Sequence, residues 1–129
     1  MLWPVKFSNL RCLTENGVKI ITEKLTMGEF KALAGQTFGD MIKGVVDVEQ
    51  NILALDAELH SDLEAFLLER GSRQKNLWGI NLYPDERENF IEFDSMINVR
   101  PTQENFSRGV ESEQIRQKIV GVVNKLVES

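Results

Sequence analysis

The sequence predicts an α+β domain, with an antiparallel sheet of about five strands and two or three helices packed on one face. Three patterns support this fold class. Residues 91–100 alternate apolar and polar side chains with the period of two that a half-buried strand requires. Short apolar runs joined by turn residues indicate hairpins, which make antiparallel pairs. Apolar stripes at helical spacing predict helices that cover the sheet.

The composition is that of an ordinary folded domain. The chain has 129 residues, of which 42% are hydrophobic and 27% charged, so it is long enough to bury one core. We expect residues 18–129 to form a single domain and residues 1–17 an N-terminal extension, because Asn16-Gly17 is typical of a turn. Trp3 and Phe7 would be costly to expose together, so the extension is either loose or covered by packing or a partner.

The first half of the chain predicts strands at 18–25, 41–49 and 52–55, with Gln50-Asn51 as the turn between the last two. A helix begins at Thr26, because Thr26 and Glu29 have the spacing of a capping box, and Leu25 and Phe30 that of a hydrophobic staple. Its expected apolar stripe is Phe30, Leu33, Ala34 and Phe38, and Gly35 or Gly39 would end it.

Residues 58–71 fit two patterns. Leu59, Leu63, Phe66 and Leu67 have helical spacing, Ser61 and Glu64 could form a capping box, and Gly71 stands where a helix C-cap belongs. The same segment also alternates as a strand would. We expect a helix because the segment lacks β-branched residues, and keep the strand as the alternative.

A second hairpin is predicted from 76 to 100, with Pro84-Asp85 opening its polar turn. In its second arm the odd-numbered residues from Ile91 to Val99 should face the core and the even-numbered ones solvent. A polar loop at 101–109 leads to a helix that starts at Ser112, with a stripe of Ile115, Ile119, Val122, Val123 and Leu126. Gly121 within it costs about 1 kcal/mol relative to alanine, unless it allows a neighbour to approach closely.

Charge and cysteine content restrict the function. A net charge of −5 and a pI near 4.9 argue against binding nucleic acid or anionic membranes through bulk charge. Cys12 is the only cysteine, which excludes an internal disulfide and a cysteine-based zinc site. We find neither a signal-peptide pattern nor an apolar run that could span a bilayer. We therefore expect a cytoplasmic protein without a cofactor, which self-associates or binds another protein rather than a membrane or nucleic acid.

Five segments resemble a known family: Val46–Glu49, Glu58–Glu64, Gly71–Gln74, Leu77–Pro84 and Ile91–Pro101. They are similar to a family of short uncharacterised prokaryotic proteins catalogued as a domain of unknown function, over about Lys19–Val127. Asp56-Ala57 stands where similar sequences are expected to carry two glycines. The resemblance implies a small bacterial or archaeal protein and brings no activity or catalytic residue with it.

His60 is the only histidine, and it lies among carboxylates. A histidine beside carboxylates is a candidate general base or metal ligand. The candidate catalytic residues are His60, Asp47 and Asp62, and weak metal-ligand candidates are His60, Asp62 and Glu49. The competing interpretation is that His60 starts a helix and that the acids are solvated near its N-terminus.

Five further residues, on a sheet face and in the loop before the last helix, are candidates for ligand binding: Asn81, Asp94, Asn98, Arg100 and Arg108. Glu92, Asp94, Asn98 and Arg100 would line an uncovered sheet face together with Asn81 and Tyr83, or would simply be its wet side. Arg100 and Arg108 could bring an anion to the N-terminus of the last helix, although the nearby glutamates oppose this.

Trp78 and Tyr83 are either core residues or part of a dimer patch. Three functional hypotheses remain open. The first is a non-enzymatic binding module, homodimeric, and the second is a metal-dependent or His/carboxylate-based hydrolase. The third is a nucleic-acid-associated toxin–antitoxin component, which would need Arg100 and Arg108 to form a local positive patch.

Overall fold

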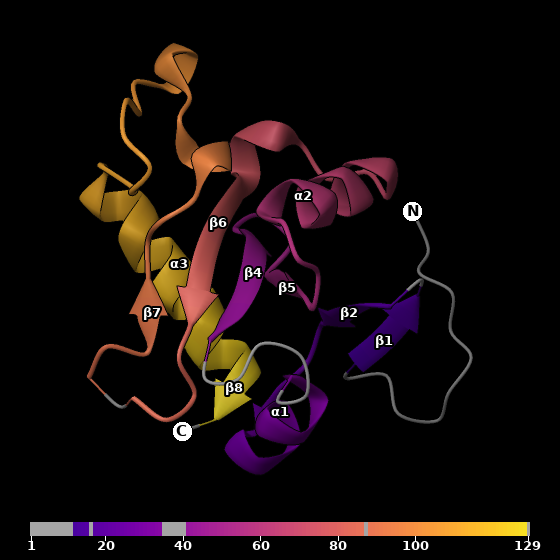
Figure 1. Cartoon of the computed structure of the whole chain (residues 1–129). Coiled ribbons are helices and arrows are strands. Elements are labelled where there is room, and N and C mark those ends of the chain that lie inside the picture. Colours follow the sequence, from indigo (N-terminus) through magenta and orange to yellow (C-terminus); the bar gives the residue numbers. More distant parts are fainter. Residues whose placement is uncertain (1–11, 16, 35–40, 87, 129) are drawn as a thin grey trace.

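A computed structural model describes residues 12–15, 17–34, 41–86 and 88–128 (Figure 1). Its main sheet has the strand order β1-β2-β5-β4-β6-β7, and every adjacent pair is antiparallel. These strands are β1 Cys12–Glu15, β2 Val18–Ile21, β4 Ile42–Asp47, β5 Ile52–Leu55, β6 Leu77–Leu82 and β7 Ile91–Glu92. The predicted α+β class and antiparallel sheet are confirmed.

The remaining elements surround this sheet. A short parallel pair joins β3 Leu25–Thr26 to β8 Val127–Glu128. The α-helices are α1 Met27–Ala34, α2 His60–Glu69 and α3 Glu113–Leu126, and three 3-10 turns lie at Gln74–Asn76, Met96–Asn98 and Pro101–Gln103. Within the described ranges, no helix has the length and apolar character needed to cross a bilayer.

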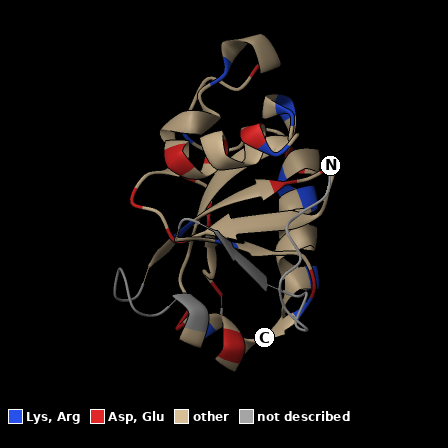
Figure 2. Cartoon of the chain, turned by 90° about the vertical axis from the view of Figure 1, so that its right-hand side faces the viewer, with Lys and Arg blue, Asp and Glu red and all other residues tan. Residues whose placement is uncertain are grey.

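The helices lie on both faces of the sheet, which differs from the expected placement on one face. Phe30 of α1 and Val122 of α3 pack with one core cluster, whereas Leu63 of α2 belongs to a second cluster on the opposite face. Viewed from the side, α3 runs along one side of the sheet and α2 lies on the other (Figure 2). The central strands explain this arrangement, because all residues of β5 and β6 are buried and both faces therefore need a cover.

The start of α1 forms as predicted. The Thr26 N–H donates to Glu29 Oε1 at 3.0 Å and the Glu29 N–H donates to Thr26 Oγ1 at 3.1 Å, which is a reciprocal capping box. Leu25 and Phe30 are both buried in the same core cluster, as a hydrophobic staple requires. The expected helix end at Gly35 or Gly39, and Phe38, lie outside the described residues.

The β4–β5 hairpin also forms as predicted, with Gln50-Asn51 in its turn, where Asn51 has a φ of 58°. Asp56, which follows β5, has a φ of 77°. Only glycine adopts such left-handed conformations without a steric penalty. The glycine that the resemblance implies at this position would therefore fit the backbone better than aspartate does.

Residues 60–69 are helical, so the helix prediction is confirmed over the strand alternative. Gly71 has a φ of 98°, and the N–H groups of Gly71 and Ser72 donate to the carbonyls of Leu68 and Leu67, which is a Schellman C-cap. The predicted capping box of Ser61 and Glu64 is wrong. The helix starts at His60, so Ser61 is already inside it and Leu59 occupies the N-cap without a side-chain bond.

The second arm of the β6–β7 hairpin departs from the predicted strand. β7 contains only Ile91 and Glu92, and the chain turns at Met96–Asn98. Beyond this turn the alternation inverts: Asn98 and Arg100 are buried, whereas Val99 is 38% exposed. The inversion has a clear cause, because the Asn98 side chain bonds to the backbone of β6 and pulls this residue inward.

The last helix agrees with its predicted stripe. Ser112 is its N-cap and accepts a hydrogen bond from the Ile115 N–H at 3.3 Å. Its buried residues are Ile119, Val122, Val123 and Leu126, and Ile115 is half-buried against the same cluster.

Gly121 of α3 is exposed, and a Cβ built on it meets no atom within 4 Å. We therefore expect Gly121→Ala to raise the free energy of unfolding by about 1 kcal/mol, since alanine loses less backbone entropy in a helix. Urea denaturation measures this change. Gly17→Ala is the matched control and should lower stability, because Gly17 has a φ of 82°. A neutral or destabilising Gly121→Ala would contradict the prediction.

Part of the predicted N-terminal extension, residues 1–17, contributes to the sheet. β1 pairs with β2 over four residues, from Cys12 opposite Ile21 to Glu15 opposite Val18. Gly17 lies in the turn that joins the two strands.

Candidate functional site

Asp47 serves the fold rather than a reaction site. Its side chain is 1% exposed, and its carboxylate accepts hydrogen bonds from Ser72 Oγ at 2.7 Å and Gln50 Nε2 at 2.9 Å. It also accepts the backbone N–H groups of Glu49 and Gln50, both at 2.9 Å. These bonds tie the β4–β5 turn to the end of α2 and leave Asp47 closed to solvent.

Arg100 and Asn98 are likewise built into the scaffold. The Arg100 guanidinium lies 4.2 Å from the centre of the Trp78 ring and donates to the carbonyls of Gln74 and Leu77. Asn98 accepts from the Gly79 N–H at 2.8 Å and donates to the Gly79 carbonyl at 3.0 Å. Arg100 is only 7% exposed, so it cannot join Arg108 in an exposed basic patch. Trp78 is buried in the core and is therefore not part of an exposed dimer patch.

The other candidates gather around Asn81, at the opposite end of β6. The Asn81 amide donates to Glu92 at 2.9 Å, and Arg108 Nε donates to Asp94 Oδ1 at 2.6 Å. His60 Nε2 lies 2.8 Å from the Ile80 carbonyl oxygen. This polar cluster is separated from Asp47 by four residues along β4, or about 13 Å.

The predicted catalytic and metal-ligand sets therefore do not assemble. His60 and Asp47 lie at different ends of the sheet, and Asp62 is exposed in the first turn of α2. Glu49 is exposed in the β4–β5 turn. In the described part of the chain, no group of three or more histidine, cysteine, aspartate or glutamate side chains could hold a metal ion.

Burial lowers the pKa of His60 below its usual 6.5, and the Lys43 ammonium acts in the same direction, while the Ile80 carbonyl opposes it. The unfolded chain thus binds this proton more tightly than the folded chain. We expect the contribution of His60 to stability to be complete above pH 6.5 and to be lost as the pH falls through its lowered pKa.

The variant His60→Gln tests this pH dependence, because glutamine keeps a donor for the Ile80 carbonyl and does not titrate. Between about pH 7.5 and about pH 5.5, its free energy of unfolding should fall less than that of the unaltered chain. Urea denaturation at the two pH values measures both. Equal decreases in the two proteins would show that His60 does not titrate differently on folding.

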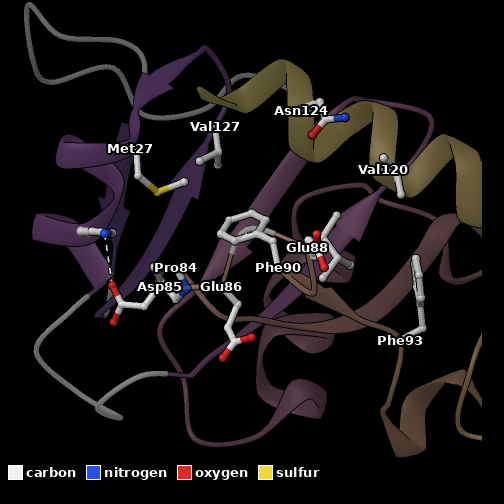
Figure 3. Close-up of a pocket in the computed structure, with 12 residues that line it drawn as sticks. Met27, Pro84, Asp85, Glu86, Glu88, Phe90, Phe93, Val120, Asn124 and Val127 are labelled. Carbon is white, nitrogen blue, oxygen red and sulfur yellow. Dashed lines mark ion pairs between the residues drawn. The ribbon is translucent and has the colours of Figure 1, made fainter. Parts of the chain in front are cut away.

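A candidate binding surface is the groove between α1, the β6–β7 hairpin and α3 (Figure 3). Its volume is about 780 Å³, within the range of ligand sites in proteins. Its apolar lining is Met27, Pro84, Phe90, Ile91, Phe93, Val120 and Val127, and its polar lining is Lys31, Asp85, Glu86, Glu88 and Asn124. The Phe90 ring points into the middle of the groove (Figure 3) and packs edge-on against Phe30 with 6.0 Å between ring centres.

The polar rim of the groove is mainly acidic. Lys31 pairs with Asp85 at 3.1 Å, which bridges α1 to the hairpin, while Glu86 and Glu88 are exposed. Arg87, between them in the sequence, lies outside the described residues. The described lining thus has three carboxylates and one ammonium group.

The comparison with known families identifies the chain. A family model described as "Protein of unknown function (DUF5674)" matches residues 19–126. The chain belongs to this family. No curated protein and no solved structure matches it. The DUF5674 match runs from β2 to the end of α3 and thus includes nearly all of the groove, whereas β1 precedes it.

The groove of this DUF5674 protein was not among the sites predicted from its sequence. Its lining comes from three segments that are far apart in the sequence, near residues 27–31, 84–93 and 120–127. One local signal was present, because the charged run from Asp85 to Glu88 ends two residues before Phe90. A charged turn beside a large aromatic residue is typical of an interface rim beside an apolar anchor point.

Proposed function

We propose that this protein is a small non-enzymatic binding module of the cytoplasm, whose groove holds a segment of a partner protein. The segment would carry apolar side chains flanked by lysine or arginine. The single observation that carries this proposal is the groove itself, which combines an apolar floor with a carboxylate rim.

The apolar residues of the groove, here called its floor, are the evidence that the ligand carries apolar side chains. Met27, Phe90, Ile91 and Phe93 are only partly buried, although all four pack against the main core cluster. A partner side chain that covers them would remove further apolar surface from water, at roughly 25 cal/mol for each Å². Because Phe30 and the sheet support Phe90 from below, the floor needs little rearrangement to accept a ligand.

The carboxylates at the rim of the groove are the evidence that the ligand also carries lysine or arginine. Glu86 and Glu88 are exposed at the mouth of the groove, and a smaller hollow of about 380 Å³ shares Glu86 and adds Glu92. With a net charge of −5, the whole chain attracts cations and repels acidic partners. Opposite charges at a rim favour the encounter and select the partner more than they strengthen the final complex.

A labelled peptide tests the proposal. The probe is a fluorescein-labelled eleven-residue peptide that alternates leucine and lysine, and its binding is measured by fluorescence anisotropy. We expect saturable binding that weakens at least about tenfold in the double variant Glu86→Lys, Glu88→Lys, because both rim charges are reversed. These residues are exposed, so the fold should be retained.

The matched control is Glu58→Lys with Glu69→Lys, which makes the same change in net charge at two exposed positions of the α2 layer. It should bind the peptide as tightly as the unaltered chain, apart from a small effect of net charge. If the two double variants lost the same amount of peptide affinity, net charge alone would explain the binding, and the proposal would be overturned. A dimer in sedimentation that only the rim variant disrupts would instead identify a second copy of the chain as the occupant.

A further inference from the structure

The outer side of β7 carries unpaired backbone groups. Among the described strands, β7 stands at the end of the sheet order and pairs only with β6 (Figure 1). The Tyr83 N–H donates to the Phe90 carbonyl at 2.9 Å, so the hydrogen bonds of this antiparallel pair fall on the even-numbered residues of the second arm. The N–H and C=O of Glu92 therefore point toward β6, whereas those of Ile91 point away from the sheet.

The contacts that follow β7 agree with this alternation. The Asp94 carbonyl accepts a bond from the Asn81 amide of β6 at 3.3 Å, whereas the Ser95 N–H donates away from β6. The acceptor of the Ser95 N–H is the Arg108 carbonyl, at 2.9 Å, so another segment already lies along the edge at this point. Within the described part of the chain, the N–H and C=O of Ile91 have no such partner. The free edge is therefore short and centred on Ile91.

A hollow lies on each face of this edge. Ile91 lines the groove, on the face that α3 covers. Glu92 points to the opposite face, where it lines the smaller hollow of about 380 Å³ together with Tyr83 and Asn89. The Asn81 amide and the Tyr83 hydroxyl both donate to Glu92 Oε1 at 2.9 Å, and Oε2 has no partner among the described residues. One face of the edge thus offers apolar contacts and the other offers a carboxylate oxygen.

An extended chain beside β7 would meet both hollows, because successive side chains of a strand point to opposite faces. We propose that the partner segment binds as an additional strand on β7, with its apolar side chains in the groove and its basic side chains at Glu86 and Glu92. This inference rests on the proposed function of the groove and specifies its ligand, which is an extended segment of alternating apolar and basic residues. Backbone bonds to Ile91 supply affinity, and the two hollows supply specificity.

The charges favour a basic partner over a second copy of the chain. Pairing of two β7 edges would bring Glu86, Glu88 and Glu92 of one copy close to the same residues of the other. Like charges on neighbouring strands destabilise their pairing, and exposed charges on an edge strand commonly prevent self-association. Lysine or arginine in an added strand would instead face these carboxylates.

Methylation of the peptide backbone tests the strand pairing. The probe is the labelled leucine–lysine peptide, N-methylated at every leucine backbone nitrogen or, in a second peptide, at every lysine backbone nitrogen. In an antiparallel pair with Ile91 the leucine N–H groups face β7, and in a parallel pair the lysine N–H groups do. We expect affinity to fall at least about tenfold for one peptide and less than about threefold for the other, since only one set of N–H groups bonds to β7. The two peptides have the same side chains and charge, so each is the control for the other.

Amide hydrogen exchange measured by NMR gives a second readout. Ile91 and Glu92 are a matched pair of neighbours in β7, because only the Ile91 N–H faces outward. In the free protein we expect the Ile91 amide to exchange faster than the Glu92 amide. Saturation with the unmethylated peptide should slow the exchange of Ile91 at least about tenfold. The methylated peptide that retains binding should protect Ile91 in the same way.

Two results would overturn the inference: equal affinities of the two methylated peptides, or an Ile91 amide that exchanges as fast in the complex as in the free protein. They are distinct from a failure of the proposed function. If the unmethylated peptide binds and the variant Glu86→Lys, Glu88→Lys weakens it, but either result is found, the groove holds the segment in another conformation and only the inference fails. If the unmethylated peptide does not bind, the proposed function fails and the inference fails with it.

Discussion

Gly79→Ala is expected to destabilise the protein by about 3 kcal/mol. A Cβ at this position in β6 would lie 2.6 Å from both Cβ and Oγ of Ser95 and 3.1 Å from Ile97 Cγ1. The strand cannot move away, because both backbone polar groups of Gly79 are bonded to the Asn98 side chain. The close approach of residues 95–98 to β6 therefore requires glycine.

Urea denaturation of Gly79→Ala measures this effect, and Gly44→Ala is its control in the neighbouring strand. At Gly44 the new Cβ meets the flexible end of Leu53 at 3.1 Å, so the loss should be smaller. Removal of the Ser95 side chain in Gly79→Ala, Ser95→Gly should restore part of the stability, as a double-mutant cycle would show. If Gly79→Ala lost no more stability than Gly44→Ala, the close packing at Ser95 would be refuted.

Asn98→Ala is expected to cost about 3 to 4 kcal/mol. The Asn98 side chain is fully buried, and its amide nitrogen donates to the Arg108 carbonyl at 3.0 Å in addition to its two bonds with Gly79. Alanine would leave these backbone groups without partners in the interior, and each buried unpaired group costs about 1 to 3 kcal/mol. The loop at 99–110 would also lose the bond from Asn98 to its Arg108 carbonyl, although Arg100 would still bond to the Leu77 carbonyl of β6.

Asn124→Ala is the matched control for this variant, because Asn124 is an exposed residue of α3 and the same atoms are removed. Its stability should stay within about 0.5 kcal/mol of the unaltered chain. Thermal or urea unfolding of the two variants gives the comparison. Similar stabilities would mean that water replaces the Asn98 bonds, and that this residue does not hold the loop.

These two variants also bear on the groove. Phe93 and Ile91 line it and precede the Ser95–Asn98 turn that packs on Gly79. A turn that no longer packs on β6 would let this wall of the groove move. We therefore expect partner binding to weaken in Gly79→Ala and Asn98→Ala even under conditions where most molecules remain folded.

The sequence by itself determined the features that depend on neighbours along the chain. The capping box of Thr26 and Glu29, the N-cap at Ser112 and the left-handed C-cap at Gly71 each involve residues within five positions of one another, so local spacing was sufficient to predict them. The hairpin turns and the apolar stripe of α3 follow from periodicity in the same way.

Only the tertiary structure decided the inversion after Ser95, the face that α2 covers and the existence of the groove. Asn98 turns inward because it bonds to Gly79, 19 residues earlier, and Asp47 is buried because Ser72, 25 residues later, donates to it. The groove joins α1 to segments some 60 and 90 residues further along the chain. Local periodicity in the sequence cannot predict hydrogen bonds or groove-lining segments at such separations, because their positions depend on how the whole sheet folds.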